Sequence, residues 1–363
     1  MSVADLALQR TKYKHLSDDE WRWFLQQVEG KERTADKLPG FAAIEDWWYP
    51  VRLSCEQCSS ELAARYKASL VSGEKMVDLT GGYGVDTYFL SEQFEHTDYV
   101  EQNAELCRIA AHNFANKPIT IHNHTAEEFL KTAGQYDLIY LDPARRDSHG
   151  GKVFRLEDCT PNVVELLPTL LAHGKRILLK LSPMLDLTQA ITCLSQVNWD
   201  IYVVAIKNEV KEVLILSGGS GQITAIDLDK KDQAFVFTKE EERDCLLTNG
   251  DATLNGGLLY EPNAAILKAG AYKLIAQRYG LSKLDVNTHL YVSETFIENF
   301  PGRVWKIIEK QDLKQANVLT RNYPLTPEQL KKKLHLRDGG TTFVIGCRVN
   351  GKPTLFYAER VTF

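Results

Sequence analysis

The chain has 363 residues, of which 44% are hydrophobic and 25% are charged, so it is long enough for two or three domains with ordinary globular cores. Its net charge of −5 gives no global sign of a nucleic-acid-binding protein. Residues 301–363, however, hold 12 Lys and Arg against 5 Asp and Glu. Such a basic end is typical of a solvated surface or of a region that meets a polyanion.

The cysteines and the apolar segments bear on the compartment. Seven scattered cysteines form no disulfide framework, which fits reduced thiols in a cytoplasmic protein. No run of about 18 apolar residues predicts a transmembrane helix, and residues 1–14 do not resemble a signal peptide. Cys55 and Cys58 have metal-ligand spacing, but no second Cys or His pair follows at zinc distance. We therefore expect a cytoplasmic protein with no membrane partner and no metal.

Residues 1–72 are predicted to form an N-terminal helical region. Ser17 and Glu20 match the capping box, and apolar residues then recur at helical spacing until Gly30, which should end the helix. A second helix is expected over 56–71. The aromatic residues between the two helices, Phe41, Trp47, Trp48 and Tyr49, are interpreted as packing residues.

Residues 73–220 alternate between short apolar strands and helical stretches, which predicts an α/β domain with a parallel sheet. The connection 207–212 is too short for a helical crossover, so the seventh strand should run antiparallel to the sixth. Gly218–Gly221 then predicts a boundary. The seven strands are expected at 75–80, 98–101, 119–122, 138–141, 176–181, 201–206 and 213–216.

Residues 221–363 are predicted to form a C-terminal α+β region. A hairpin is expected within 223–238, and one helix over 262–278. The segment Val349-Asn350-Gly351 predicts the turn between the last two strands.

The segment from Asp78 to Gly84, Asp-Leu-Thr-Gly-Gly-Tyr-Gly, follows the first predicted strand and opens a helix. Glycines let a ligand approach the backbone, and a helix start presents amide donors. A dinucleotide fingerprint wants a third small residue where this chain has Thr87. A carboxylate at Asp78 suits a ligand that carries an ammonium group and no phosphate. This combination indicates S-adenosylmethionine.

Two further acids and a lysine end the following strands. Glu101 ends the second strand, where an acid can accept both hydroxyls of a ribose, although a surface acid is the alternative. Asp142 and Pro143 close the fourth strand at the edge where doubly wound sheets bind ligands. Asp142 could position a methyl acceptor, act as a general base or simply end the strand. Lys180 ends the fifth strand and should face the same edge.

These motifs, in this order, resemble those of class I S-adenosylmethionine-dependent methyltransferases. The resemblance implies a Rossmann-like seven-stranded sheet. Two departures concern Thr80, which stands where Gly or Ala is usual, and Thr125, which stands where many members carry an acid facing the adenine. The resemblance assigns the cofactor to Asp78, Thr80, Gly81, Gly82, Gly84, Glu101, Thr125, Ala126 and Asp142.

The acceptor atom stays open at this point. Ala144-Arg145 stands where amino-group methyltransferases carry Pro-Tyr, so the stacking aromatic is missing. The segment after the fifth strand, 180–183, lacks the cysteine with which carbon methyltransferases attack a pyrimidine, which disfavours a covalent route. Cys159 is a weak alternative nucleophile.

Four segments more specifically resemble a bacterial group of methyltransferases with a ferredoxin-like and THUMP-like C-terminal region. They are 141–146, 180–186, 260–264 and 321–325. Because THUMP domains in general bind RNA, the resemblance implies an RNA substrate. Asp142, Pro143, Arg145 and Lys180 would then be the catalytic residues, with Arg145 and Arg146 near a phosphate. The alternatives are a methyltransferase of a protein or small molecule, and a non-catalytic RNA-binding protein with a relic cofactor fold.

Overall fold

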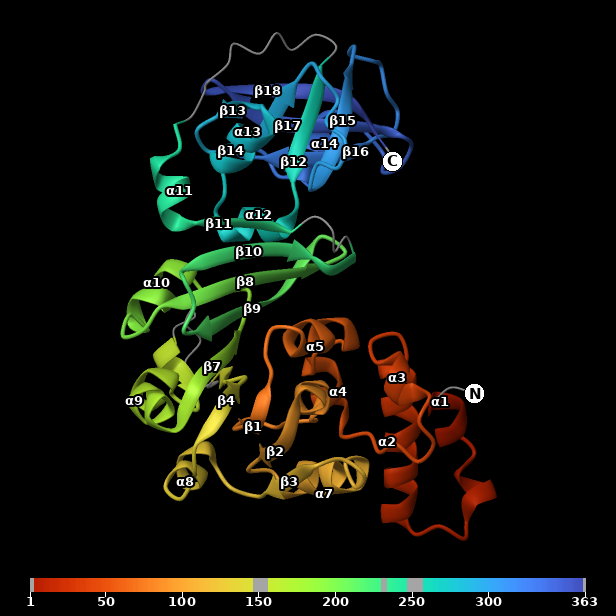
Figure 1. Cartoon of the computed structure of the whole chain (residues 1–363). Coiled ribbons are helices and arrows are strands. Elements are labelled where there is room, and N and C mark those ends of the chain that lie inside the picture. The colour runs from red at the N-terminus through yellow and green to blue at the C-terminus, as the bar shows by residue number, and fades with distance from the viewer. Residues whose placement is uncertain (1–2, 146–155, 230–233, 247–256, 362–363) are drawn as a thin grey trace. The chain divides into compact units, whose positions relative to one another are not determined.

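The structure is a computed structural model that describes residues 3–145, 156–229, 234–246 and 257–361 (Figure 1). The chain divides into two compact units. The first contains Met1–Trp199 and Leu214–Gly218, and the second contains Asp200–Val213 and Gly219–Phe363.

The first unit begins with helices and continues as a strand–helix alternation. Its elements are α1 (Val3–Ala7), η1 (Arg10–Tyr13), α2 (Asp18–Thr34), α3 (Pro39–Ala42), α4 (Arg52–Gln57), α5 (Glu61–Ala68), β1 (Gly73–Asp78), α6 (Val85–Leu90), η2 (Ser91–Gln93), β2 (Phe94–Val100), α7 (Ala104–Asn113), β3 (Ile119–His122), α8 (Ala126–Leu130), β4 (Tyr136–Leu141), β5 (Ala144–Arg145), η3 (Leu156–Asp158), β6 (Cys159–Thr160), α9 (Val163–His173), β7 (Gly174–Leu181) and α10 (Leu187–Cys193).

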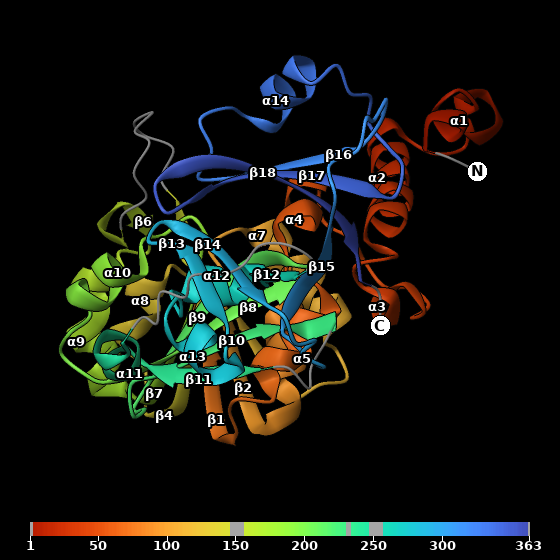
Figure 2. The same ribbon diagram turned by 90° about the horizontal axis from the view of Figure 1, so that it is seen from above.

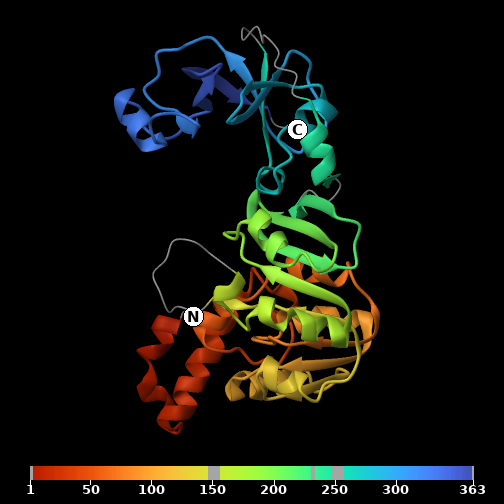
Figure 3. The ribbon, with the colours of Figure 1, turned by 90° about the vertical axis from the view of Figure 1, so that its left-hand side faces the viewer.

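The N-terminal helices differ from the sequence prediction in two places. The capping box of Ser17 and Glu20 is present, but α2 runs through Gly30 to Thr34. A Cβ at Gly30 would lie 2.2 Å from the Cβ of Tyr49, so this glycine permits close packing and does not end the helix. The helix expected over 56–71 is two helices, α4 and α5, and Ser60 caps the second. Figure 3 shows the first helices of the chain, in red, lying together at one side of the first unit.

The strands of the first unit pair in parallel, as the α/β pattern predicts. The order β3-β2-β1-β4-β7 is parallel at every pair. The carboxyl ends of these five strands therefore meet at one edge of the sheet. Strand β1 is the topological switch point, because the chain moves outward from it to β2 and β3 and then crosses back to β4.

The full sheet has nine strands, so the expected count of seven is wrong. Its order is β11-β10-β8-β9-β7-β4-β1-β2-β3, with β8 (Trp199–Ile206), β9 (Glu209–Ser217), β10 (Gln222–Asp227) and β11 (Phe235–Thr238). The hairpin of β10 and β11 forms as predicted, but β10 also pairs in parallel with β8 and so extends the sheet.

Short turns connect β8 to β9 and β9 to β10. Lys207 and Asn208 both have positive φ, the pattern of a type I′ turn, which joins antiparallel neighbours. Gly218 and Gly221 also have positive φ, so the glycine segment is a turn of defined conformation.

The second unit continues with a sheet of seven strands in the order β13-β14-β12-β15-β18-β17-β16. The helix expected over 262–278 is two helices, because Gly270 with φ +87° ends the first one. The turn at Asn350 and Gly351 joins the last two strands as predicted. The elements are α11 (Lys239–Asp244), β12 (Leu258–Pro262), α12 (Ala264–Ala269), α13 (Leu274–Tyr279), β13 (Ser282–Asp285), β14 (Thr288–Ser293), β15 (Gly302–Ile308), β16 (Asn317–Arg321), α14 (Pro327–Lys333), β17 (Thr342–Val349) and β18 (Lys352–Arg360).

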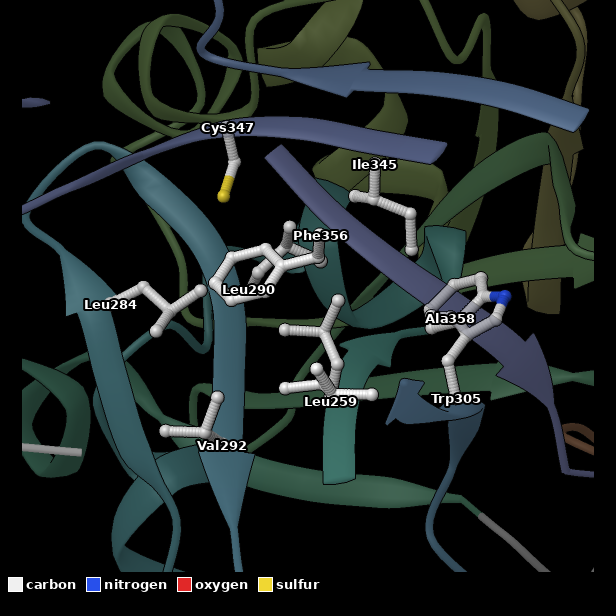
Figure 4. Close-up of a cluster of buried hydrophobic side chains, with 10 residues drawn as sticks. Leu259, Leu284, Leu290, Val292, Trp305, Ile345, Cys347, Phe356 and Ala358 are labelled. Atoms are coloured by element: carbon white, nitrogen blue, oxygen red, sulfur yellow. The ribbon is translucent and has the colours of Figure 1, made fainter. Parts of the chain in front are cut away.

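The second sheet has its own hydrophobic core. Alternate residues of β12, β14, β15, β17 and β18 point to one face, where Trp305, Leu259 and Phe356 lie together (Figure 4). Helix α14 packs against β16 on a smaller cluster around Leu330 (Figure 2). The region is thus an α+β unit, as the sequence predicts.

Candidate active site

A pocket of about 330 Å³ opens at the carboxyl edge of the parallel strands of the first unit. It brings together most residues that the sequence analysis selected, from five separate strand ends. The lining residues include Asp78, Thr80, Gly81, Gly82, Gly84, Glu101, Thr125, Ala126, Asp142 and Lys180. Pro143 is buried next to Asp142 but is not among the lining residues.

The glycine loop between β1 and α6 is shaped by its protein neighbours. A Cβ at Gly81 would lie 2.2 Å from the Cε2 atom of Tyr99, and one at Gly84 would lie 2.5 Å from the Cζ atom of Phe114. Gly82 and Gly84 have φ of +55° and +83°. The glycines are therefore needed by the fold itself, and the same lack of side chains leaves the loop backbone open toward the pocket.

Asp78 ends β1 and is buried, with 1% of its surface exposed. Its Oδ1 atom accepts hydrogen bonds from the N–H of Thr80 at 2.9 Å and the hydroxyl of Thr80 at 3.3 Å, and its Oδ2 atom accepts one from the hydroxyl of Thr87 at 2.6 Å. Burial raises the pKa of Asp78 to about 7, although these hydrogen bonds oppose the rise. A cationic group in the pocket would favour the ionised carboxylate.

The hydrogen bonds of Thr80 give a reason for a threonine at the position where the resembled methyltransferases usually have Gly or Ala. Its Oγ1 atom accepts a hydrogen bond from the N–H of Asp142 at 2.6 Å while it faces Asp78. One hydroxyl thus connects the ends of β1 and β4, which are separated by about 60 residues in the chain. A glycine or alanine at this position would leave the N–H of Asp142 without this partner.

Glu101 follows β2 and turns toward the glycine loop. Its Oε2 atom accepts the N–H of Gly82 at 2.9 Å, and its Oε1 atom accepts the N–H of Asn103 at 2.8 Å. A carboxylate oxygen has two lone pairs, so each oxygen can accept one more hydrogen bond. The arrangement can therefore receive the two hydroxyls of a ribose.

Thr125 and Ala126 line the pocket at the start of α8. The hydroxyl of Thr125 accepts the N–H of Glu128 at 3.2 Å, and the carboxylate of Glu128 accepts the N–H of Thr125 at 3.1 Å. This is a capping box, and the spacing Thr-x-x-Glu in the sequence could have revealed it. The Thr125 side chain is thus committed to the helix cap.

Asp142 follows β4 and forms an ion pair with Lys180, which lies on β7. The neighbouring two-stranded sheet of β5 and β6 places Ala144 and Thr160 on the pocket wall. Arg145 belongs to β5, and Arg146 lies outside the described residues. The structure therefore brings Asp142 and Lys180 together.

Sequence reasoning missed the charges behind this pair. Asp86 on α6 lies between two lysines: its Oδ1 atom is 3.2 Å from Nζ of Lys67, and its Oδ2 atom is 3.7 Å from Nζ of Lys180. Asp86 also accepts hydrogen bonds from Ser59 at 2.8 Å and Tyr140 at 2.7 Å. Burial opposes its ionisation, but Lys67, Lys180 and these two hydroxyls lower the pKa of Asp86.

The N-terminal helical region forms one wall of the pocket. Ser54, Gln57, Cys58 and Ser59 lie between or on α4 and α5 and line the cavity. Cys55 and Cys58 therefore take part in packing and in this wall, and the described residues contain no group of His, Cys, Asp or Glu arranged to hold a metal ion.

The predicted aromatic cluster joins this helical region to the glycine loop. The ring of Phe41 packs on Trp47 with centroids 4.2 Å apart, and the indole N–H of Trp47 donates to the hydroxyl of Tyr83 at 2.9 Å. Trp48 stacks on His112 with centroids 3.7 Å apart. The helices thus both brace the sheet and contribute to the pocket.

Cys159 is buried in β6, and burial raises the pKa of its thiol to about 11. A thiol with that pKa is a poor nucleophile at neutral pH.

Among the described residues, no helix has the length and apolar character needed to cross a membrane.

Comparisons with known proteins agree with this architecture. Residues 258–301 match the model of a ferredoxin-like domain, and residues 302–360 match that of a THUMP domain-like family. An uncharacterized S-adenosylmethionine-dependent methyltransferase from Mycobacterium tuberculosis strain H37Rv is 22% identical over 350 residues, covering 91% of this chain and 94% of that protein.

A solved structure extends the similarity over almost the whole chain. A candidate methyltransferase from Porphyromonas gingivalis W83 is 33% identical, with a TM-score of 0.85, and the match covers 96% of this chain and 92% of that one. These comparisons confirm the resemblance that the motifs indicate. The chain belongs to the family of S-adenosylmethionine-dependent methyltransferases that carry ferredoxin-like and THUMP-like domains in their C-terminal region.

Proposed function

We propose that this enzyme holds S-adenosylmethionine in the pocket at the carboxyl edge of β1, β2 and β4 and methylates RNA. The observation that carries the proposal is the convergence of Asp78, Glu101 and Asp142 on one cavity, each from a different strand end. Ligands of doubly wound sheets bind at this edge and at this switch point. When bound, S-adenosylmethionine supplies a methyl group on a positively charged sulfur.

The residues present fit this ligand. Asp78 is a buried carboxylate whose raised pKa falls once an ammonium group lies beside it. Glu101 has acceptor capacity left for ribose hydroxyls, and the loop of Gly81 and Gly82 exposes backbone to the ligand. Thr125 and Ala126 would border the adenine through backbone atoms, because the Thr125 hydroxyl already caps α8.

Two observations support RNA as the acceptor. Residues 302–360 match a THUMP domain-like family, and THUMP domains in general bind RNA. The segment 301–363 also carries a positive excess of seven charges in a chain whose total charge is negative. Asp142 and Lys180 would face the methyl acceptor, and Pro143 would hold Asp142 in its turn.

The cofactor part is tested by calorimetric titration with S-adenosylmethionine. Wild-type protein and the exposed control Asp36→Asn should bind at micromolar concentration, whereas Asp78→Ala should lose binding. Because Asp78 is buried and accepts three hydrogen bonds, Glu101→Gln serves as a second variant with a less disturbed interior. Unchanged affinity in both site variants would refute this placement of the ligand.

The RNA part is tested separately with total bacterial RNA. Filter binding should weaken steeply as salt rises from 50 to about 200 mM, because phosphate contacts release counterions. Transfer of labelled methyl from S-adenosylmethionine to RNA should accompany it. Binding of the cofactor without any labelling of RNA would retain the methyltransferase and exclude RNA, and labelled protein in an RNA-depleted lysate would then identify the alternative acceptor.

A further inference from the structure

The ion pair of Asp142 and Lys180 is the outer end of a row of four alternating charges. Lys67, Asp86, Lys180 and Asp142 follow one another, with Nζ–O distances of 3.2 and 3.7 Å at the inner two steps and the ion pair of Lys180 and Asp142 at the third. Side-chain exposure rises along the row from 0% for Lys67 through 10% and 13% to 41% for Asp142. The row therefore begins in the interior and ends in the pocket.

The inner members fix the position of the Lys180 ammonium group. Asp86 pairs with Lys67 and accepts hydrogen bonds from the hydroxyls of Ser59 and Tyr140, and these three partners favour an ionised carboxylate in this position. Lys180 lies between this anion and Asp142. A cation is thus placed beside the carboxylate that faces the acceptor, and it offsets the charge of that carboxylate.

Among the lining residues that the structure describes, no aromatic ring offers an open face for a flat base beside Asp142. Among the described lining residues, Tyr83 and Tyr140 are 5% and 1% exposed, and their hydroxyls bond to Trp47 and Asp86. His124 follows β3, which is separated from β4 by β1 and β2. Stacking on an aromatic face, which positions a base for methylation of its nitrogen, therefore has no partner among these residues at the Asp142 end.

The charges also discriminate between acceptor atoms. Methyl transfer to a neutral nitrogen leaves a positive charge on that nitrogen, and a neighbouring ammonium group repels it. Transfer to a hydroxyl oxygen requires the oxygen to lose its proton and gain negative character, and the same ammonium group attracts it. A carboxylate next to the hydroxyl can accept the proton. The pair of Asp142 and Lys180 therefore suits an oxygen acceptor.

We propose that the methyl acceptor is a hydroxyl oxygen held against the ion pair of Asp142 and Lys180 and, resting on the proposed RNA function, that it is a ribose 2′-hydroxyl. The hydroxyl donates its hydrogen bond to Asp142, and its oxygen lies beside the Lys180 ammonium group. A C–O bond forms as the C–S bond breaks, the electron pair of the broken bond stays on sulfur, and the hydroxyl proton passes to Asp142 and then to water. Asp86 and Lys67 are positioning residues that act through Lys180.

The experiment uses the full chain with labelled S-adenosylmethionine and total bacterial RNA. The RNA is digested to nucleosides, and mass spectrometry locates the methyl group. We expect it on ribose, and alkaline hydrolysis should leave the labelled linkages uncut because a methylated 2′-oxygen cannot attack the neighbouring phosphate. A methyl group on a base nitrogen or carbon overturns the proposal.

A matched pair of variants tests the role of the charge. Lys180→Met should lower methyl transfer at least about 100-fold, whereas Lys180→Arg should keep it within about tenfold, because only the second retains a cation. Calorimetric affinity for S-adenosylmethionine should stay within threefold in both, which shows that the cofactor pocket is intact. An unchanged or faster rate in Lys180→Met contradicts an oxygen acceptor.

Failure of the RNA function has a different signature from failure of this inference. If label appears in protein and not in RNA, the RNA assignment fails, and the methylated atom is located by mass spectrometry of the digested protein. A methyl ether on a Ser, Thr or Tyr hydroxyl supports the oxygen acceptor, whereas a methyl group on nitrogen, or an alkali-labile methyl ester on a carboxylate, refutes it. Absence of transfer to any component of a cell lysate overturns both proposals.

Discussion

Two buried carboxylates, one in each unit, hold two cations apiece, and they serve different ends. Asp86 in the first unit lies between Lys67 and Lys180, and Glu261 in the second lies between Arg303 and Arg321. Asp86 and Lys180 of the first cluster line the pocket described above. The second connects the strands β12, β15 and β16, so its charges tie one sheet together.

The two clusters differ because the first one continues to a fourth charged residue, Asp142. Lys180 meets Asp142 as well as Asp86, so the cluster of the first unit extends into the pocket, where a substrate can meet it. Glu261 is 2% exposed, and its arginines are 27% and 37% exposed. The arginines therefore meet water on their outer side, whereas Lys67 is entirely enclosed. A buried charge cluster thus becomes part of a reactive site when one of its members also lines a pocket.

The largest effect should come from breaking the enclosed end of the first cluster. Lys67→Met leaves Asp86 without its buried cation, which should destabilise the first unit by about 3 to 5 kcal/mol and lower its Tm by about 10 °C. Thermal unfolding followed by circular dichroism measures this loss. Lys131→Met, at an exposed position, is the control and should change Tm by less than about 1 °C. Equal stability of the two variants would show that Lys67 contributes no net ion pairing.

The corresponding change in the second cluster should be milder. Glu261→Gln removes the shared anion but leaves both arginines partly in water, so we expect a loss of about 2 to 3 kcal/mol. Affinity for S-adenosylmethionine, measured by calorimetry, should not change. A loss of cofactor affinity in this variant would contradict a purely structural role for Glu261.

A pair of tyrosine variants sharpens the comparison at smaller scale. Tyr140→Phe removes the hydrogen bond at 2.7 Å to ionised Asp86 and should destabilise the protein by about 1.5 to 2 kcal/mol while also slowing methyl transfer. Tyr260→Phe removes two hydrogen bonds, one to the carbonyl of Thr295 and one from the N–H of Ile297. Each lost hydrogen bond should destabilise the protein by about 1 kcal/mol. Methyl transfer should be unchanged in Tyr260→Phe. Equal slowing in both variants would show that methyl transfer does not depend on the hydrogen bond from Tyr140 to Asp86.

The smallest effect concerns the pH dependence of cofactor binding. Burial raises the pKa of Asp78 to about 7, against hydrogen bonds from Thr87 and Thr80 and with the charges of Asp86 and Asp142 acting in the same direction as burial. Below this pKa the carboxyl is neutral and binds an ammonium group poorly, so the affinity for S-adenosylmethionine should rise by up to about tenfold from pH 6 to pH 8.

The raised pKa of Asp78 also predicts how the stability of the protein changes with pH. Because the folded pKa lies above the unfolded value of 3.8, the contribution of Asp78 to stability is greatest below about pH 4 and is lost as pH rises to 7.

The affinity prediction is checked by calorimetry between pH 6 and pH 8. The Glu101→Gln variant leaves Asp78 in place, so its affinity for S-adenosylmethionine should depend on pH as steeply as that of the wild type. A flat profile in wild-type protein would contradict ionisation of Asp78 on binding.

Local sequence was sufficient for much of the fold and for the pocket's main elements. The run from Asp78 to Gly84, Glu101 and Asp142 each follows a strand, and parallel strands bring their carboxyl ends to one edge, so strand order alone predicts their convergence. The capping box of Ser17 and the turn at Asn350 likewise depend on neighbouring residues and form as expected. Each of these features is determined by residues within one element or at its end.

Other features were decided only by contacts between distant segments. A glycine such as Gly30 is typical of a helix end, yet Gly30 lies inside α2, where its lack of a side chain leaves room for the side chain of Tyr49. The hairpin of β10 and β11 is visible in the sequence, but its pairing with β8 is not, because edge pairing depends on which strand is left open.

The charge row shows the same limit. Lys67, Asp86 and Lys180 are widely separated in the chain, and no local pattern distinguishes a lysine that will be enclosed from one that will face water. The sequence by itself determined where strands end and which chemical groups follow them. Tertiary structure decided which of those groups are desolvated together, and desolvation is what turns ordinary charges into a strongly coupled set.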